Sequence, residues 1–394
     1  MSDFGPPQFV FVACQRGAEE VLKREVTRGL PGARLAFSRP GLVTFKLEKP
    51  CDKPEQFALP STFARTYGFS LGRVQGEQLR DLAEQTWRLA AASEFLANRT
   101  IHDLHVWQRD AAAPGERGFE PGPTPLAEEA ERALRALSPW KPLRAMPVTP
   151  RTPSRRNVWV LDVVLVEPNQ WWVGCHRTTR RFAAWPGGVR PLELPAHAAS
   201  RAYLKMEEAL DWSALPIARG NLCLELGCAP GGASQALLDR GLCVLGVDPA
   251  EVDPEVVAHP RFMHLRRRCK DVPHRQFREV QWLAADMNVA PSYTLDAVES
   301  IVARQETSIR GLLLTLKLTD WKLVDELPQY IQRVVGWGYR DVRTRQLAFN
   351  RQEICLVALR SRGQRRIRRH SRQQRRWDAA HAGKPAGPHF SLNM

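Results

Sequence analysis

One stretch near the middle of the chain constrains the fold more than any other. An apolar run, Leu222–Leu226, is followed by the residues G-C-A-P-G-G and then by a helical pattern. This order predicts a strand, a tight glycine turn and the start of a helix, where backbone can approach a ligand and free N–H groups favour a polar or negative group. The next strand-like run ends at Asp248, whose carboxylate can accept both hydroxyls of a nucleotide ribose. Together these features predict a nucleoside-containing cofactor on a doubly wound sheet.

The glycine spacing narrows the choice of cofactor. The pattern G-x-x-P-G-G differs from the G-x-G-x-x-G of dinucleotide sites and from the phosphate-binding G-x-x-x-x-G-K-[ST]. It resembles motif I of S-adenosylmethionine (SAM)-dependent methyltransferases, and its A-P-G-G core resembles the FtsJ-type ribose methyltransferases. When the turn is considered alone, a glycine and proline turn without a ligand is the alternative. The resemblance implies SAM as the cofactor, with these candidate binding residues: Gly227, Ala229, Pro230, Gly231, Gly232, Asp248 and Asp286.

Strand-like and helical patterns alternate from about Leu192 to Leu359. Such alternation is typical of a parallel sheet with helices on both faces. The last two strand-like runs, 341–347 and 353–359, have only a short connection and predict an antiparallel hairpin at the sheet edge. The predicted fold class is therefore α/β, a Rossmann-like methyltransferase domain with a terminal antiparallel hairpin. An α+β region is expected to precede it.

Four charged residues occupy positions that the apolar pattern of the predicted strands and helices does not explain. Lys205 lies on a predicted amphipathic helix, Asp286 and Lys317 end two strand-like runs, and Glu353 begins the last run. Because ligands bind at the carboxyl ends of parallel strands, Asp286 and Lys317 are expected to face the same crevice as the glycine turn. Each residue alone is compatible with a strand-end salt bridge, but the four together predict a catalytic site.

These four residues resemble, in order and setting, the Lys-Asp-Lys-Glu tetrad of the FtsJ-like ribose 2′-O-methyltransferases. The stretches that carry the resemblance are S-R-x-x-L-K-x-E-E-A, D-M-x-x-x-P, L-K-L and R-x-E, and they are most similar to the large-subunit rRNA 2′-O-ribose methyltransferase M family. The resemblance implies Lys317 as the general base, with Lys205, Asp286 and Glu353 positioning it and the hydroxyl. It also implies RNA, namely large-subunit rRNA, as the partner. A lysine can act as a base only when neutral, and neighbouring carboxylates oppose that state whereas a second cation favours it.

Two stretches depart from the family pattern. Ala202 and Tyr203 replace a stretch that usually carries a hydroxyl, and Arg268 stands where the family has an acid on the adenine side. A backbone group or Asp271 would then have to accept a hydrogen bond from the adenine. A non-catalytic RNA-binding or ribosome-assembly factor that retains the methyltransferase fold is therefore the alternative function.

The rest of the chain divides by composition. Residues 1–60 predict a small α+β unit, and residues 61–190 are expected to form a THUMP-like RNA-binding region with a Pro-rich insertion at 111–156. Residues 191–360 correspond to the FtsJ-like methyltransferase domain. The 394-residue chain has a net charge of +15, and nine arginines lie within 360–376. Residues 361–394 therefore predict a basic, disordered tail suited to a polyanion such as RNA, with a merely solvated tail as the alternative.

Several classes of protein do not fit the sequence. No apolar run approaches the ~18 residues that a transmembrane helix needs, and the N-terminal residues lack the hydrophobic core of a signal peptide, so a cytoplasmic protein without a membrane partner is expected. The eight cysteines form no C-x-x-C pair, and His259, His264 and Cys269 match no standard zinc spacing, so no metal is expected. The sequence leaves the oligomeric state open.

Overall fold

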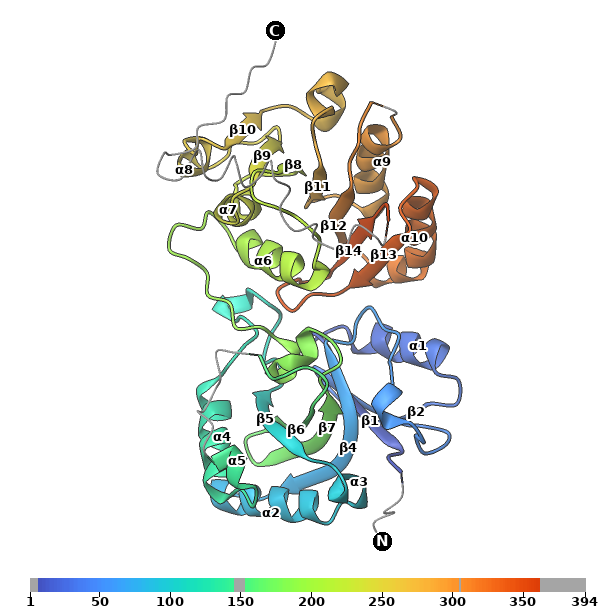
Figure 1. Cartoon of the computed structure of the whole chain (residues 1–394), viewed down its shortest axis with the longest axis vertical. Helices are drawn as coiled ribbons and strands as arrows, with labels where there is room; N and C mark the ends of the chain where they lie inside the picture. The colour runs from blue at the N-terminus through green and yellow to red at the C-terminus, as the bar shows by residue number, and fades with distance from the viewer. Residues whose placement is uncertain (1–5, 145–152, 305, 362–394) are drawn as a thin grey trace, which may run out of the picture. The chain divides into compact units, whose positions relative to one another are not determined.

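The computed structural model describes residues 6–144, 153–304 and 306–361, and the chain divides into two compact units (Figure 1). Unit 1 contains residues 1–192 and 348–351, and unit 2 contains residues 193–347 and 352–394. Each unit is built on its own seven-stranded sheet. Among the described helices, none combines the length and the apolar character needed to cross a bilayer.

The sheet of unit 1 has the order β2-β3-β1-β4-β7-β6-β5. β5 and β6 pair in parallel, whereas the other neighbouring strands are antiparallel. Because β1 pairs with β4, strands from residues 1–60 and from residues 61–190 share this one sheet. The helices and strands are β1 (Phe9–Ala13), α1 (Glu19–Gly29), β2 (Arg34–Arg39), β3 (Leu42–Lys46), β4 (Thr66–Gln75), α2 (Leu79–Ala91), α3 (Glu94–Ala97), β5 (Ile101–Gln108), α4 (Pro125–Leu137), α5 (Lys141–Arg144), β6 (Trp159–Glu167) and β7 (Gln170–Arg177).

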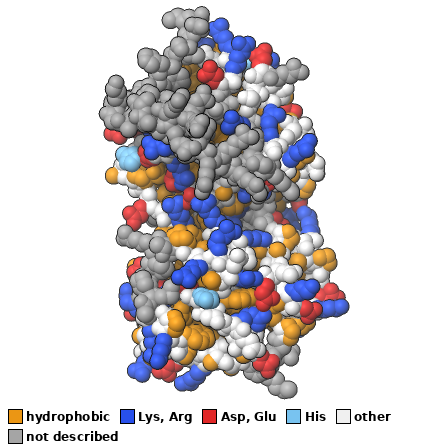
Figure 2. Space-filling view, viewed as in Figure 1, with side chains coloured by type: hydrophobic (Ala, Val, Ile, Leu, Met, Phe, Trp, Pro, Cys, Tyr) orange, Lys and Arg blue, Asp and Glu red, His pale blue; other side chains and the backbone are white. Residues whose placement is uncertain are grey.

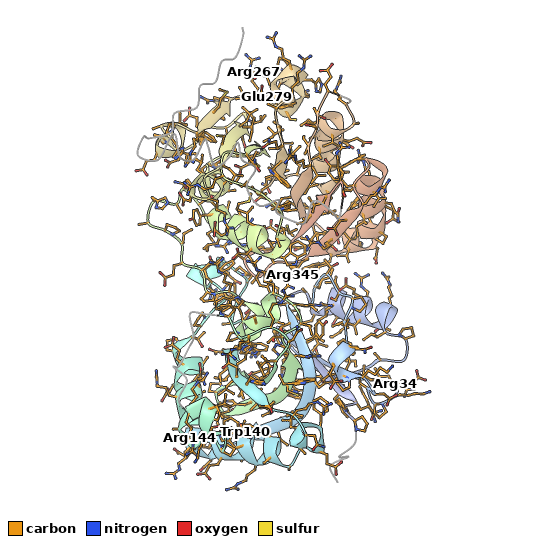
Figure 3. The ribbon with its side chains drawn as sticks, in the orientation of Figure 1. Arg34, Trp140, Arg144, Arg267, Glu279 and Arg345 are labelled. Carbon is orange, nitrogen blue, oxygen red and sulfur yellow. The ribbon has the colours of Figure 1, made fainter. Side chains whose placement is uncertain are left out.

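The helix α4, which falls within the Pro-rich stretch 111–156, is part of the core of unit 1. Its N-terminus is capped by Thr124, whose hydroxyl accepts a hydrogen bond from the backbone N–H of Ala127. Trp87 of α2 donates its indole N–H to the carbonyl of Leu134 at 2.9 Å and packs edge-to-face on Trp140, which Figure 3 labels beside α5. α4 therefore packs against α2, and residues 145–152 of the same stretch lie outside the described residues.

The sheet of unit 2 has the order β10-β9-β8-β11-β12-β14-β13. The first five strands in this order are parallel, and β14 lies antiparallel between β12 and β13. This arrangement confirms the predicted α/β class with a terminal antiparallel hairpin. The helices and strands are α6 (Ala202–Ser213), β8 (Leu222–Leu226), α7 (Gly232–Asp239), β9 (Cys243–Val247), α8 (Pro254–Val257), β10 (Phe262–Leu265), β11 (Trp282–Ala285), α9 (Pro291–Val302), β12 (Gly311–Lys317), α10 (Leu327–Gly336), β13 (Asp341–Arg345) and β14 (Glu353–Leu359).

Helices cover both faces of the sheet in unit 2. α6 and α7 bury their apolar sides with β8, β9 and β12 in one hydrophobic cluster, and Figure 1 shows α9 and α10 on the opposite side of the sheet. Because both faces are covered, the central strands are mostly apolar, and β14 is buried throughout. The charged residues Lys317 and Glu353 accordingly stand at strand ends. Residues 362–394 of the predicted basic tail lie outside the described residues.

Candidate active site

The four predicted catalytic side chains come from four different elements of unit 2. Lys205 lies near the start of α6, Asp286 directly follows β11, Lys317 ends β12 and Glu353 begins β14. Because β14 runs antiparallel to β12, Lys317 and Glu353 face each other as partners in the ladder. The topology therefore brings residues from distant parts of the sequence to the carboxyl edge of the parallel strands.

The four side chains form a closed ring of alternating charge. Lys205 Nζ lies 2.5 Å from Glu353 Oε1 and 3.5 Å from Asp286 Oδ2. Lys317 Nζ lies 2.8 Å from Asp286 Oδ1 and 2.5 Å from Glu353 Oε2. The side chain of Glu353 is only 4% exposed, and the other three are 14–19% exposed. Two ammonium and two carboxylate groups thus share a site that solvent reaches only partly.

The ring shifts the pKa values of Lys317 and Glu353. Burial lowers the pKa of Lys317, but the carboxylates of Asp286 and Glu353 outweigh burial and raise that pKa above its ordinary value of 10.5. Burial raises the pKa of Glu353, but the ammonium groups of Lys205 and Lys317 outweigh it and hold the pKa below its ordinary value. At neutral pH Lys317 therefore carries its proton, and the Glu353 side chain is a carboxylate.

The glycine turn lies directly beside this ring. Gly227 has a φ of +78°, and a Cβ at this position would lie 2.8 Å from the carbonyl oxygen of Asp286. Gly231 has a φ of +121° and precedes α7, and a Cβ there would lie 2.8 Å from Val256. A side chain at either position would strain the backbone and clash, so both must be glycine. The predicted turn residues all lie between β8 and the first turn of α7: Gly227, Ala229, Pro230, Gly231 and Gly232.

Asp248 is held beside the turn by the pairing of β8 with β9. Its Oδ2 accepts a hydrogen bond from the N–H of Ala229 at 3.2 Å, and its Oδ1 accepts one from the N–H of Ala250 at 2.8 Å. No described side chain caps the start of α7. An oriented carboxylate, an uncapped helix start and a turn without room for side chains together fit a nucleoside cofactor.

Glu225 is a polar residue of this region for which the sequence pattern predicts no role. It lies within β8, is 1% exposed, and its Oε2 accepts a hydrogen bond from the hydroxyl of Ser234 on α7 at 2.5 Å. Burial raises its pKa to about 8, even though the hydrogen bond from Ser234 opposes the rise. The sequence does carry a signal for a special role of Glu225: it is an acidic residue within the apolar segment L-C-L-E-L.

The positions that depart from the family pattern lie in two parts of unit 2. Tyr203 donates its hydroxyl to Asp239 Oδ2 at 2.8 Å and so ties α6 to α7. Arg268 and Asp271 are both exposed and follow β10, close to Arg267, whose side chain Figure 3 labels at the margin of unit 2. The exposed Asp271 leaves its carboxylate accessible as a hydrogen-bond acceptor for an adenine.

A comparison with protein-family models matches part of this second unit. Residues 198–325 match the family model of FtsJ-like methyltransferases. The "Ribosomal RNA large subunit methyltransferase M" of Halorhodospira halophila is 31% identical over 179 residues, which cover 45% of this chain and 51% of that protein. The protein of the same name from Alkalilimnicola ehrlichii is 33% identical over 188 residues, covering 45% and 50%. The chain thus spans about half the length of the curated relatives it matches.

Solved structures show only weak overall similarity. The crystal structure of TrmN from Thermus thermophilus covers 89% of this chain at 16% identity with a TM-score of 0.32. A score this low supports no assignment. The sequence matches indicate a methyltransferase domain with S-adenosyl-L-methionine as its cofactor.

Proposed function

We propose that this chain transfers a methyl group from SAM to a ribose 2′-hydroxyl of RNA, and that its substrate is large-subunit rRNA. The observation that carries the proposal is the ring of Lys205, Asp286, Lys317 and Glu353 beside the glycine turn. Similarity to FtsJ-like methyltransferases and to proteins named for large-subunit rRNA supports the substrate class. SAM would be held by the turn, Gly227–Gly232, and by Asp248, and it supplies an electrophilic methyl group when bound.

The ring would prepare a hydroxyl for this transfer. A ribose hydroxyl is a weak acid, so its oxygen needs a base within hydrogen-bond reach. We assign Lys317 as the base, because its Nζ is oriented by Asp286 and Glu353 from two sides. Lys205 balances the charge of Glu353 and so reduces the pull of that carboxylate on the proton of Lys317. Positioning of the hydroxyl by this rigid ring would supply much of the rate, since alignment alone can be worth ~7–11 kcal/mol.

The remaining regions are assigned to RNA binding as part of the same proposal. Residues 1–60 would form the N-terminal α+β part and residues 61–190 a THUMP-like part, ahead of the catalytic domain at 191–360. In the view of Figure 2, Lys and Arg side chains are spread over both units among acidic and apolar ones. The tail 361–394 would add non-specific attraction to phosphate.

Methyl transfer to unmodified rRNA is the direct test. Labelled SAM and unmodified total rRNA are incubated with the wild type, Lys317→Ala or Lys317→Arg, and the products are digested to nucleosides. We expect a 2′-O-methylated nucleoside with the wild type and a loss of at least ~100-fold with both variants, because alanine removes the base and arginine keeps its proton. Lys322→Ala is the matched control, since Lys322 is an exposed lysine outside the ring.

Calorimetric titration with SAM separates the possible failures. Both Lys317 variants are expected to bind SAM, because Lys317 is not among the cofactor residues. A methylated base in place of a methylated ribose would contradict the role of the ring. A wild type that binds RNA but neither binds SAM nor transfers a methyl group would instead be the non-catalytic ribosome-assembly factor.

A further inference from the structure

A second group of polar side chains is buried in the sheet of unit 1, outside the candidate active site. His105 on β5, Asp162 on β6 and His176 on β7 are 1%, 0% and 4% exposed. His105 and Asp162 are paired in parallel register, and one donor atom from each of the three side chains lies within 4.8 Å of those of the other two. These residues are far apart in the sequence and match no spacing motif, so the sequence alone does not group them.

The hydrogen bonds of His105 determine which of its nitrogens carries the proton. Ser154 donates its single hydroxyl hydrogen to Asp103 Oδ2 at 2.6 Å, and Asp103 is also paired with the buried Arg135. Ser154 Oγ must therefore accept from His105, whose Nε2 lies 2.8 Å away. The proton of His105 is then on Nε2, and Nδ1 carries a lone pair. Among the described residues, none donates a hydrogen bond to this buried nitrogen.

His176 has a similar arrangement. Its Nε2 lies 2.7 Å from the carbonyl oxygen of Ala183, which can only accept, so Nε2 must donate. Its Nδ1 lies 2.5 Å from Asp162 Oδ2, which is the separation of two atoms that share a proton. The second oxygen of Asp162, Oδ1, has no hydrogen-bond partner among the described residues although it is fully buried. The cluster thus contains two acceptors, His105 Nδ1 and Asp162 Oδ1, that lack donors.

We propose that His105, Asp162 and His176 bind a divalent transition-metal ion of the zinc class, which stabilises unit 1. Two imidazole nitrogens and one carboxylate form a ligand set that Zn²⁺ accepts, and a water molecule can complete the tetrahedron. The Nε2 of each imidazole donates a hydrogen bond, that of His105 to the hydroxyl oxygen of Ser154 and that of His176 to the carbonyl oxygen of Ala183. Metal-binding histidines usually donate a hydrogen bond from the nitrogen that does not bind the metal. An ion would satisfy the unpartnered nitrogen of His105, and it would replace the proton of the contact between His176 and Asp162.

Metal binding requires a small local rearrangement. Two ligand atoms of one zinc ion lie ~3.3 Å apart when each is ~2.0–2.1 Å from the metal, whereas His176 Nδ1 and Asp162 Oδ2 lie 2.5 Å apart. The ion would replace the proton between His176 Nδ1 and Asp162 Oδ2, and that proton would be released to solvent. The two atoms would then move apart. A buried water that donates to both free acceptors is the competing occupant.

Metal content of the full-length, tag-free protein tests the proposal. The protein is stripped with a chelator, incubated with Zn²⁺ and desalted, and zinc is measured by elemental analysis. We expect one zinc per chain. The protein loaded with Co²⁺ should show the visible absorption of a tetrahedral ion without a sulfur-to-cobalt band. A thiolate band would place the ion on a cysteine and overturn the proposal, as would a folded protein that retains no zinc.

Variants locate the ion independently. Zinc affinity should fall at least ~100-fold in His105→Gln and Asp162→Asn, and by ~10–100-fold in Ser154→Ala, which acts only through His105. The matched control is His102→Gln, because His102 is exposed on the same strand as His105. Circular dichroism checks that each variant is folded. Equal zinc binding in all folded variants would overturn the assignment, and the cobalt spectrum of the wild type decides the matter if the variants fail to fold.

Discussion

Lys317 is subject to two opposing requirements. As the proposed base it must lose its proton, yet Asp286 and Glu353 raise its pKa above 10.5. The neutral fraction is therefore small at neutral pH and grows tenfold with each pH unit below that pKa. We expect the single-turnover rate of methyl transfer to rise about tenfold per unit between about pH 7 and 9. A flat rate over this range, measured by rapid quench with saturating RNA and SAM, would show that the proton leaves by another route.

Glu225 makes the stability of unit 2 depend on pH. Its pKa is about 8 in the folded protein and 4.5 without the fold, so between these values the folded state keeps a proton that the unfolded state has lost. Stability should therefore decrease as pH rises through this window, by at most ~1.4 kcal/mol per unit. Glu225→Gln keeps an acceptor for Ser234 and removes the titration. Urea midpoints of the wild type should fall relative to the variant from about pH 5 to 8, and parallel profiles would contradict this interpretation.

At the scale of elements, the position of α6 depends on α7. Arg240, just after α7, contacts both carboxylate oxygens of Glu207 at 2.7 and 2.8 Å and Asp211 at 3.2 Å, and both acids lie on α6 with Lys205. A lysine side chain has a single nitrogen and cannot form this bidentate contact. Arg240→Lys is therefore expected to lower the free energy of unfolding by ~0.5–1.5 kcal/mol and to reduce methyl transfer several-fold with SAM affinity unchanged.

An exposed ion pair provides the control for this variant. Arg278 contacts Glu306 at 3.2 Å, and both side chains are more than half exposed. Arg278→Lys should leave stability and activity near the wild-type values, because exposed pairs contribute little. If both substitutions had the same effect in urea unfolding and transfer assays, the contact of Arg240 with α6 would not be what positions Lys205.

The elements differ in how well local sequence predicts them. The helix α4 and the β6–β7 hairpin follow from local pattern and from the two-residue Pro168-Asn169 connection. The ten-residue strand β4 has no clear local signal, because Gly68 and Gly72 interrupt its alternation. β4 is stabilised by pairing with β1 on one side and β7 on the other, and such long-range pairing leaves no local pattern.

For the whole molecule, the basic tail should control the electrostatic part of RNA binding. Each phosphate that the protein no longer neutralises reduces the slope of log K against log salt by ~0.7–0.9. Deleting residues 361–394 is therefore expected to weaken RNA binding at low salt and to flatten its salt dependence, as measured by filter binding over a series of KCl concentrations. Replacing the arginines of this segment by glutamine should have the same effect at full length. An unchanged slope in both proteins would exclude the tail from RNA binding.

The sequence by itself determined the strand, glycine turn and helix from Leu222 to Asp239, the α/β class of unit 2 and the candidate residues of its site. These features depend on periodicity and on residue types a few positions apart. Only the tertiary structure decided that the four charged residues close into a ring, that Glu225 is buried and bonded to Ser234, and that three buried residues of β5, β6 and β7 meet in unit 1. The physical reason is that these distances depend on strand order and register, which arise from pairing between segments remote in the chain.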